Sequence, residues 1–325
     1  MTGTCPISVI VPAHNAAQTI EDCVQGLLQQ SVDRALYEII IVDDGSTDST
    51  PEIAADHPSV RVVRQRNAGP AAARNRGARE ARGEILLFTD ADCVPAGDWI
   101  EQMAAPFEAA DGIVGAKGIY RSDQRALMAR FVQLEYEEKY RRMAGYEYID
   151  FIDTYSAGYR RDVFLENGGF DESFPTASVE DQEFSFRLAQ QGLKMVFVPG
   201  ACVYHLGHAD TVTKYVRKKF KIGYWKVLVH SRHPEKMIAD AHTPQILKLQ
   251  LVLAAAWAAL LVGGVVWPVL WWGALAAIGA FLLTTAPFFW RALSRDVVVA
   301  LLAPVLLFLR AWALGAGFAL GLVRR

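Results

Sequence analysis

The stretch Ile85-Leu86-Leu87-Phe88-Thr89-Asp90-Ala91-Asp92 joins an apolar run to two carboxylates spaced one residue apart. Side chains alternate along an extended chain, so residues two apart point to the same side. Asp90 and Asp92 can therefore converge on one point, such as a divalent cation whose other ligands are phosphate oxygens. Because Asp also favours turns, the pair alone equally fits a strand that ends in a turn.

Two more polar clusters follow apolar runs nearer the N-terminus. Residues 7–11 form a β-rich run that is closed by Pro12-Ala13-His14-Asn15, and residues 37–42 form an almost uninterrupted apolar run that ends in the acidic cluster 43–48. Runs without polar alternation suit parallel strands covered on both faces. These two runs therefore predict neighbouring buried strands.

Helical patterns alternate with the predicted strands. Helices are expected at about 18–30, from 49 and at 70–81, with further strands at 60–63 and 84–89. This alternation predicts a parallel α/β sheet with right-handed crossovers. Ligands of such sheets bind at the carboxyl ends of the strands, where all three polar clusters lie, so we predict a binding site there.

The segment around Gly69 offers a second kind of binding group. Gly69-Pro70 suits a turn into the first helical position, and Arg74 lies one turn further on. The N-terminus of a helix with a nearby arginine can receive a phosphate. Ordinary helix capping with an unrelated arginine is the alternative.

Four motifs together resemble the glycosyltransferases of family 2, which have the GT-A fold. The motifs are I-S-V-I-V-P-A-H-N (7–15), I-I-V-D-D-G-S-T-D (40–48), N-A-G-P-A-A-A-R-N (67–75) and G-E-I-L-L-F-T-D-A-D (83–92). Their order and spacing match that family, and the resemblance covers about residues 6–205. It implies an α/β nucleotide-diphospho-sugar transferase domain, of Rossmann-like type, that moves a sugar with inversion at the anomeric carbon.

The resemblance also implies roles for individual residues. Asp92 would hold Mg²⁺ or Mn²⁺ on the diphosphate, and His205 is a further candidate metal ligand. The acid that often follows the first motif in the family is replaced here by Ala16-Ala17. The residues expected to bind the nucleotide sugar are Pro12, Ala13, His14, Asn15, Asp44, Gly69, Arg74, Asp90 and Ala91.

A later segment resembles the acceptor side of the same family. Gly158 lies in S-A-G-Y-R, where Tyr159 stands at a position that is often Asn in the family, and Glu180-Asp181 opens a predicted helix. An inverting transfer needs one general base opposite the leaving group. By resemblance Asp181 is that base, and Glu180 is an acceptor or structural partner. The alternative is that acidic residues merely favour a helix N-terminus.

The C-terminal third predicts a membrane part. Residues 249–290 carry no charge, enough for two crossings at about 246–267 and 269–290. A basic amphipathic segment, 211–245, precedes them, which indicates a cytoplasmic flank. We therefore predict a multi-pass protein of the cell membrane with a cytoplasmic catalytic domain at 1–210.

The last apolar stretch, 297–323, is harder to assign. It is long enough to span a membrane, but Arg310 lies at its centre, which costs at least about 2.5 kcal/mol unless it is paired. A full crossing would place Arg324 and Arg325 outside, whereas a re-entrant or interfacial arrangement keeps them inside. We favour the second arrangement.

A membrane part beside a sugar-transfer site suggests a lipid-linked or cell-envelope saccharide as acceptor. The Q-x-x-R-W motif of processive polysaccharide synthases is missing at 217–225, so single-sugar addition is expected. The alternatives are a processive synthase subunit, a sugar-phosphate nucleotidyltransferase, for which the glycine-rich motif after the first strand is missing, and a non-catalytic nucleotide-sugar-binding scaffold. The net charge of −2 gives no indication of nucleic acid, and the four scattered cysteines fit a reducing compartment.

Overall fold

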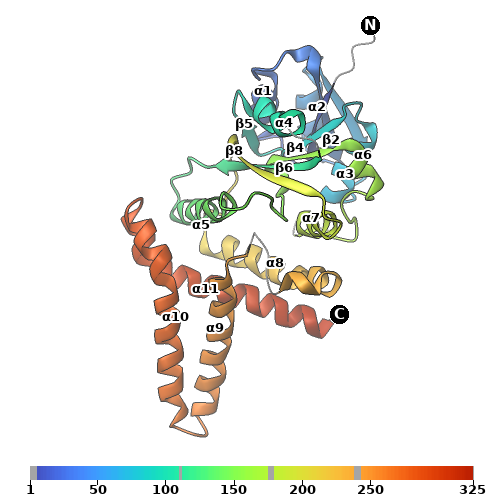
Figure 1. The fold of residues 1–325 in the computed structure, drawn as a ribbon. Helices are drawn as coiled ribbons and strands as arrows, with labels where there is room; N and C mark the ends of the chain where they lie inside the picture. The colour runs from blue at the N-terminus through green and yellow to red at the C-terminus, as the bar shows by residue number, and fades with distance from the viewer. Residues whose placement is uncertain (1–5, 110–111, 175–178, 238–242, 325) are drawn as a thin grey trace. The chain divides into compact units, whose positions relative to one another are not determined.

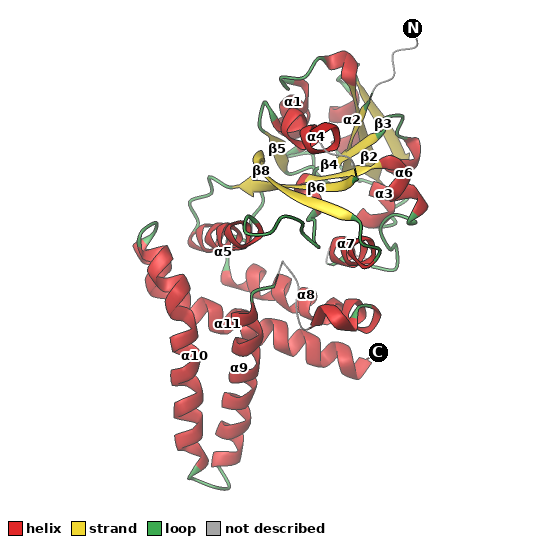
Figure 2. Cartoon of the chain, in the orientation of Figure 1, coloured by secondary structure: helices red, strands yellow, loops and turns green. Residues whose placement is uncertain are grey.

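The computed structural model describes residues 6–109, 112–174, 179–237 and 243–324. The chain divides into two compact units, one made of residues 1–123 and 140–207 and the other of residues 124–139 and 208–325. Cys5 and residues 238–242 of the expected juxtamembrane segment lie outside the described part. Figure 2 shows that the strands belong to the first unit and that the second is helical.

The first unit is built on an eight-stranded sheet. Its strand order is β3-β2-β1-β4-β7-β6-β8-β5. The strands are β1 (Ile7–Ala13), β2 (Tyr37–Asp44), β3 (Val60–Gln65), β4 (Ile85–Phe88), β5 (Cys93–Pro95), β6 (Ile113–Arg121), β7 (Ala157–Arg160) and β8 (Lys194–His205).

The sheet is mixed, and the parallel arrangement that the sequence pattern predicted for its first four strands is confirmed. The strands β3, β2, β1 and β4 are parallel, as expected. However, β7 pairs antiparallel with both β4 and β6, and β5 pairs antiparallel with β8. The sequence did not predict these antiparallel pairs, because β5 and β7 are only three and four residues long, too short for a periodic signal.

Six helices accompany this sheet in the described part of the chain, and the bounds of α1 and α3 were predicted to within about two residues. They are α1 (Ile20–Leu28), α2 (Thr50–Ala55), α3 (Pro70–Glu80), α4 (Trp99–Ala109), α6 (Arg161–Glu166) and α7 (Glu180–Gln190). Pro70 opens α3, because its missing N–H would be unpaired there in any case. The helix N-termini thereby follow the strand ends that carry the polar clusters.

An aromatic core connects β4 to α7. Phe88, at the end of β4, packs against Tyr159, Phe164 and Phe170. Phe184 of α7 contacts Tyr159, Phe164 and Phe170 in turn. All five rings are buried, and each contributes about 1.5–3 kcal/mol by leaving water. This cluster fixes the start of α7 relative to the end of β4.

The second unit contains the membrane-type helices. It comprises residues 124–139, which include most of α5 (Leu127–Met143). Its other helices are α8 (Val212–Arg232), α9 (Gln245–Gly264), α10 (Leu270–Leu293) and α11 (Val297–Arg324). The last three are long and apolar enough to cross a membrane, close to the expected ranges. Within this unit α9 and α10 form a hairpin, and α8 and α11 run across it (Figure 1).

Candidate active site

The carboxyl end of β2 is tied to the segment that leads into α3. The carboxylate of Asp44 accepts hydrogen bonds from the backbone N–H groups of Ala68 and Gly69, each at 2.8 Å. It also accepts one from the Gln65 side chain at 2.8 Å. Gly69 has a positive φ of 92°, which glycine adopts without strain. Asp44 therefore fixes the conformation of the loop that contains Gly69. The sequence predicted that Gly69 binds the nucleotide sugar.

The end of β1 forms the adjoining part of this edge. His14 and Asn15 are exposed, Ala13 is buried, and Pro12 is half-buried. His14 Nδ1 lies 3.0 Å from the backbone oxygen of Asp44, and Asn15 Oδ1 accepts from the N–H of Thr47 at 2.8 Å. The predicted nucleotide residues on β1 and β2 are thus brought together, with His14 and Asn15 open to a ligand.

Arg74 joins the D-A-D turn to the start of α7. Its guanidinium donates to Asp90 Oδ1 at 2.7 Å and to Glu180 Oε1 at 3.2 Å. Arg74 and Glu180 are each only 3% exposed. The structure therefore assigns Arg74 to neutralising two carboxylates, and the charge predicted to receive phosphate is already engaged with Asp90 and Glu180.

Asp92 and His205 meet where β5 pairs with β8. Asp92 Oδ2 lies 3.7 Å from His205 Nε2, and the Asp92 side chain is 39% exposed. His205 Nδ1 accepts the N–H of Gly207 at 3.0 Å, which directs Nε2 towards Asp92. One carboxylate and one imidazole with open space suit a divalent ion that takes its remaining ligands from phosphate oxygens.

Cys93 completes this group of possible ligands among the described residues. Burial, followed by the charges of Asp90 and Asp92, raises the pKa of its thiol well above the usual range. Mg²⁺ and Mn²⁺ prefer oxygen ligands to sulfur, so the buried Cys93 thiol is the least suited of the three groups. Asp92 and His205 are therefore the candidate metal ligands in this group.

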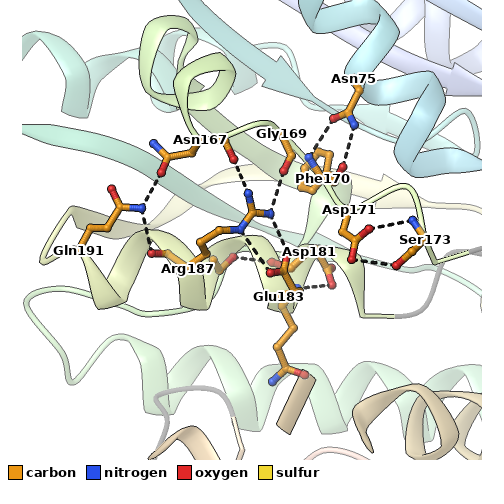
Figure 3. A network of polar contacts seen from close by, with 12 residues as sticks. Asn75, Asn167, Gly169, Phe170, Asp171, Ser173, Asp181, Glu183, Arg187 and Gln191 are labelled. Carbon is orange, nitrogen blue, oxygen red and sulfur yellow. Dashed lines mark hydrogen bonds and ion pairs between the residues drawn. The ribbon is translucent and has the colours of Figure 1, made fainter. Parts of the chain in front are cut away.

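Residues 167–170 are held against α3 and α7 by polar contacts that Figure 3 shows. Arg187 of α7 donates to the backbone oxygens of Asn167 and Gly169 and pairs with Glu183. Asn75 of α3 accepts from the N–H of Phe170 at 2.9 Å and donates to its carbonyl at 2.7 Å. These contacts attach residues 167–170 to the helix that carries Asp181.

Asp181, the second residue of α7, lies where its surroundings disfavour the charged carboxylate. Its Oδ1 accepts the N–H of Gln182 at 2.7 Å. Its pKa is raised well above that of an ordinary Asp, first by burial and then by the charges of Glu180 and Asp153, with Arg74 acting in the opposite sense. A carboxylate with a raised pKa holds a proton more tightly and is the better general base near neutral pH.

Ala91 and Gly158 lie deeper than the sequence suggested. Ala91 is buried between the two Asp residues. Gly158 sits in β7, where a Cβ would come within 3.0 Å of the Leu87 side chain and 3.2 Å of Met103 and Phe107. Close packing against β4 and α4 therefore explains why a glycine is needed there.

The sequence analysis missed a buried polar cluster in the same unit. Lys117 of β6 is fully buried and lies 2.5 Å from Asp153 Oδ2. Its ammonium also donates to the Tyr155 hydroxyl, which is 2.9 Å from that of Tyr140. A lysine within a largely apolar strand could have indicated a buried charge. Its partner Asp153 lies 36 residues away in a loop, however, so the pair could not be predicted from the strand.

The comparisons with known proteins agree with this architecture. Residues 8–168 match the family model described as Glycosyl transferase family 2. Glycosyltransferase AglE of Haloferax volcanii is 37% identical over 108 residues, covering 31% of this chain and 36% of that protein. EpsH of Bacillus subtilis, also named as a glycosyltransferase, is 29% identical over 244 residues, covering 68% of this chain and 66% of that protein. The chain thus matches less than two thirds of the length of either relative.

A solved structure supports the same fold. Mannosyltransferase PcManGT from Pyrobaculum calidifontis is 22% identical and superimposes with a TM-score of 0.57, covering 98% of this chain and 86% of that chain. At this level of identity the likeness shows the shared GT-A fold.

Removing the charge of Lys117 should destabilise the first unit, which carries the candidate active site and is called the catalytic unit below. Lys117→Met leaves Asp153 buried without its cation, which typically costs about 3–5 kcal/mol, or roughly 6–20 °C in Tm for a unit of this size. Thermal unfolding of the full chain in detergent measures the change. Arg64→Met, which breaks the exposed Arg64–Glu52 pair, is the control and should cost at most about 1 kcal/mol. Equal effects of the two substitutions would contradict this account.

Proposed function

We propose that this chain, whose residues 8–168 match the model of Glycosyl transferase family 2, is a glycosyltransferase that transfers one sugar from a nucleoside-diphosphate sugar, with inversion and with the help of Mg²⁺ or Mn²⁺. The observation that carries the proposal is the bridge from Asp90 through Arg74 to Glu180. It holds the carboxylates of the donor side next to the helix that begins with the proposed base. PcManGT, which shares the fold, was solved with GDP-Man and Mn²⁺, and this supports a nucleotide-sugar donor and a divalent ion.

The nucleotide is assigned to the edge formed by the ends of β1 and β2. The exposed side chains of His14 and Asn15 are available to the base and ribose. Asp44 acts mainly through the backbone of Ala68 and Gly69, since its oxygens already accept from their N–H groups. Asp90 faces the ribose side of the same site while its charge is balanced by Arg74.

Asp92 and His205 would hold the metal ion. When bound, the ion supplies Lewis-acid stabilisation of the charge that develops on the leaving diphosphate. The half-exposed Asp92 side chain leaves room for phosphate oxygens beside it. His205 is fixed by Gly207, so its ring presents Nε2 to the same space.

Asp181 takes the proton from the attacking hydroxyl of the acceptor. The bond from this oxygen to the anomeric carbon forms as the bond to the diphosphate breaks, and the proton goes to the Asp181 carboxylate. Glu180 stays on Arg74, so it positions the helix and does not compete for the proton. Adjacent helical residues point in different directions, which separates these two roles.

We further propose that the acceptor is a lipid-linked or cell-envelope saccharide and that the catalytic unit is cytoplasmic. The apolar helices α9, α10 and α11 support this, because an acceptor held in the membrane would be available to an enzyme anchored there. A processive synthase or a non-catalytic scaffold remains the alternative that product analysis can exclude.

Asp181→Asn should abolish transfer without abolishing donor binding. Loss of a positioned general base typically lowers the rate by about 10²–10⁴-fold. The measurement is release of the nucleoside diphosphate by purified full chain in detergent, with a panel of donors and acceptors, alongside donor affinity. Asp162→Asn, an exposed acid at the start of α6, is the matched control. Undiminished transfer by Asp181→Asn would refute the assignment, and failure of the native chain to bind any donor would favour the scaffold.

The pH dependence of kcat/KM should report the raised pKa of Asp181. Transfer requires the deprotonated carboxylate, so activity is lost as pH falls through this pKa, at higher pH than for an ordinary Asp. Glu180→Gln removes one charge that raises the pKa, so its acidic limb should move to lower pH. Glu172→Gln, an exposed acid outside this set, should leave the limb in place. A limb that moves to higher pH in Glu180→Gln would contradict the proposed coupling.

Removal of divalent ions should stop transfer. Chelation with EDTA should reduce the rate to background, and Mg²⁺ or Mn²⁺ should restore it. Asp92→Asn should raise the metal concentration needed for half-maximal activity by about 10-fold or more, because a neutral amide is the weaker ligand. Activity that is insensitive to EDTA would show that Asp92 and His205 serve another purpose.

A further inference from the structure

The charge at the centre of α11 is compensated within the second unit. Arg310 donates from Nη1 to Glu135 Oε1 and from Nη2 to Gln250 Oε1, both at 2.7 Å. Glu135 Oε2 also pairs with the Lys219 ammonium at 3.2 Å and accepts a hydrogen bond from the Tyr215 hydroxyl at 2.9 Å. The Arg310 and Glu135 side chains are only 12% and 7% exposed. Arg310 therefore faces protein and has a carboxylate partner, from α5.

The C-terminal half of α11 packs directly on α8. A Cβ at Gly317 would lie 2.1 Å from the Phe220 carbonyl, and one at Gly321 would lie 2.7 Å from the Tyr224 carbonyl. On α8 itself, a Cβ at Gly223 would lie 2.2 Å from the Leu314 carbonyl. The two backbones are thus in contact over two turns, which only glycine permits. Residues 220–224 of α8 must therefore lie at the same depth in a membrane as the part of α11 that they contact.

The composition of α8 limits that depth. This helix exposes four basic side chains at spacings of three, one and three residues, which places them on one side. Each charged residue at the centre of a bilayer costs at least about 2.5 kcal/mol. The α8–α11 pair therefore cannot lie across the hydrocarbon core. The four residues are Lys214, Arg217, Lys218 and Lys221.

The opposite face of α11 is apolar and is exposed towards both ends of the helix. Exposed apolar residues recur every three or four positions in its first turns and again in its last turns. They form an apolar stripe in two segments, which are separated by Phe308 and Trp312 where these pack on Trp257 of α9. Arg310, Gly317 and Gly321 lie on the other side of the helix. The stripe consists of Val298, Leu301, Val305, Ala316, Ala319 and Val323.

The direction of α11 differs from that of the hairpin. Figure 1 shows α11 running across α9 and α10, which lie side by side. Phe308 of α11 packs against Trp257 of α9 and Phe281 of α10, so the crossing is a packed contact. If the hairpin follows the membrane normal, α11 lies in the membrane plane.

We propose that α11 is an in-plane helix of the membrane interface, with its apolar stripe on the lipid acyl chains and its Arg310 face covered by α5 and α8. Amphipathic helices in this position bury their apolar face about 5–10 Å below the headgroups. The occupant of the uncovered stripe is the lipid bilayer itself. The hairpin α9–α10 then provides the crossings, and α11 does not add a third. This inference is independent of the catalytic assignment.

Depth measurements along the stripe test the proposal. Single nitroxide labels are placed at Val298→Cys, Val305→Cys, Ala316→Cys and Val323→Cys in full chain with Cys5→Ser, reconstituted into phosphatidylcholine–phosphatidylglycerol vesicles. The depth of each label is obtained from the ratio of its accessibility to oxygen, which concentrates in the membrane, to its accessibility to a water-soluble relaxant. An in-plane helix gives one common depth within a few Å. A spanning helix covers about 37 Å between the first and last label, and a maximum depth in the middle would overturn the proposal.

Matched labels on α10 show that the method resolves a crossing. Leu275, Leu282 and Trp290 are exposed on that helix and should differ in depth by roughly 10 Å per step. The labelled positions are all uncovered side chains, so the substitutions should leave the fold intact.

The side of the C-terminus provides a second readout. Ser294→Cys, before α11, and Arg324→Cys, at its end, should react with a membrane-impermeant maleimide from the same side of sealed vesicles. Reaction of the two from opposite sides would show a third crossing and overturn the proposal.

Discussion

The catalytic unit depends on one buried guanidinium. Arg74 lies on α3, yet it neutralises Asp90 at the end of β4 and Glu180 at the start of α7. A buried charge is tolerated only when it is paired, and loss of one partner leaves the others unbalanced. The three elements are therefore held in one arrangement by electrostatics as well as by the aromatic core around Phe88.

This bridge also separates the roles of neighbouring acids. Because Glu180 is engaged by Arg74, the adjacent Asp181 lies beside a fixed negative charge in a buried setting, and both effects raise its pKa. On the donor side, Asp90 is balanced by the same cation, whereas Asp92, two residues on, stays half-exposed next to His205. One arginine thus leaves one carboxylate as proposed base and another as proposed metal ligand.

The sequence was informative where a function is encoded locally. Strand ends followed by polar clusters identified β1, β2, β4 and the acids Asp44 and Asp92, because hydrophobic period and turn chemistry lie within a few residues. It was not informative about partners that are far apart. The residues around Arg74 predict that it binds a phosphate. Its pairing with Glu180, which lies 106 residues away, could not be predicted from that segment. The pairing of Lys117 with Asp153 and the antiparallel insertion of β7 were missed for the same reason.

The second unit also pairs a charge that would be costly alone, but here the charge lies on a membrane-type helix. Composition alone shows that Arg310 is costly in a membrane, but not that Glu135, 175 residues earlier, offers a carboxylate. Neutralising a charge does not remove the need to keep polar atoms bonded, and Gln250 and Tyr215 supply those bonds around the pair. Such a network needs a polar helix on one side of α11, and α5 and α8 are both polar. A helix with charged neighbours on one side and only apolar residues on the other is matched to a boundary between water and lipid, since neither uniform medium satisfies both faces.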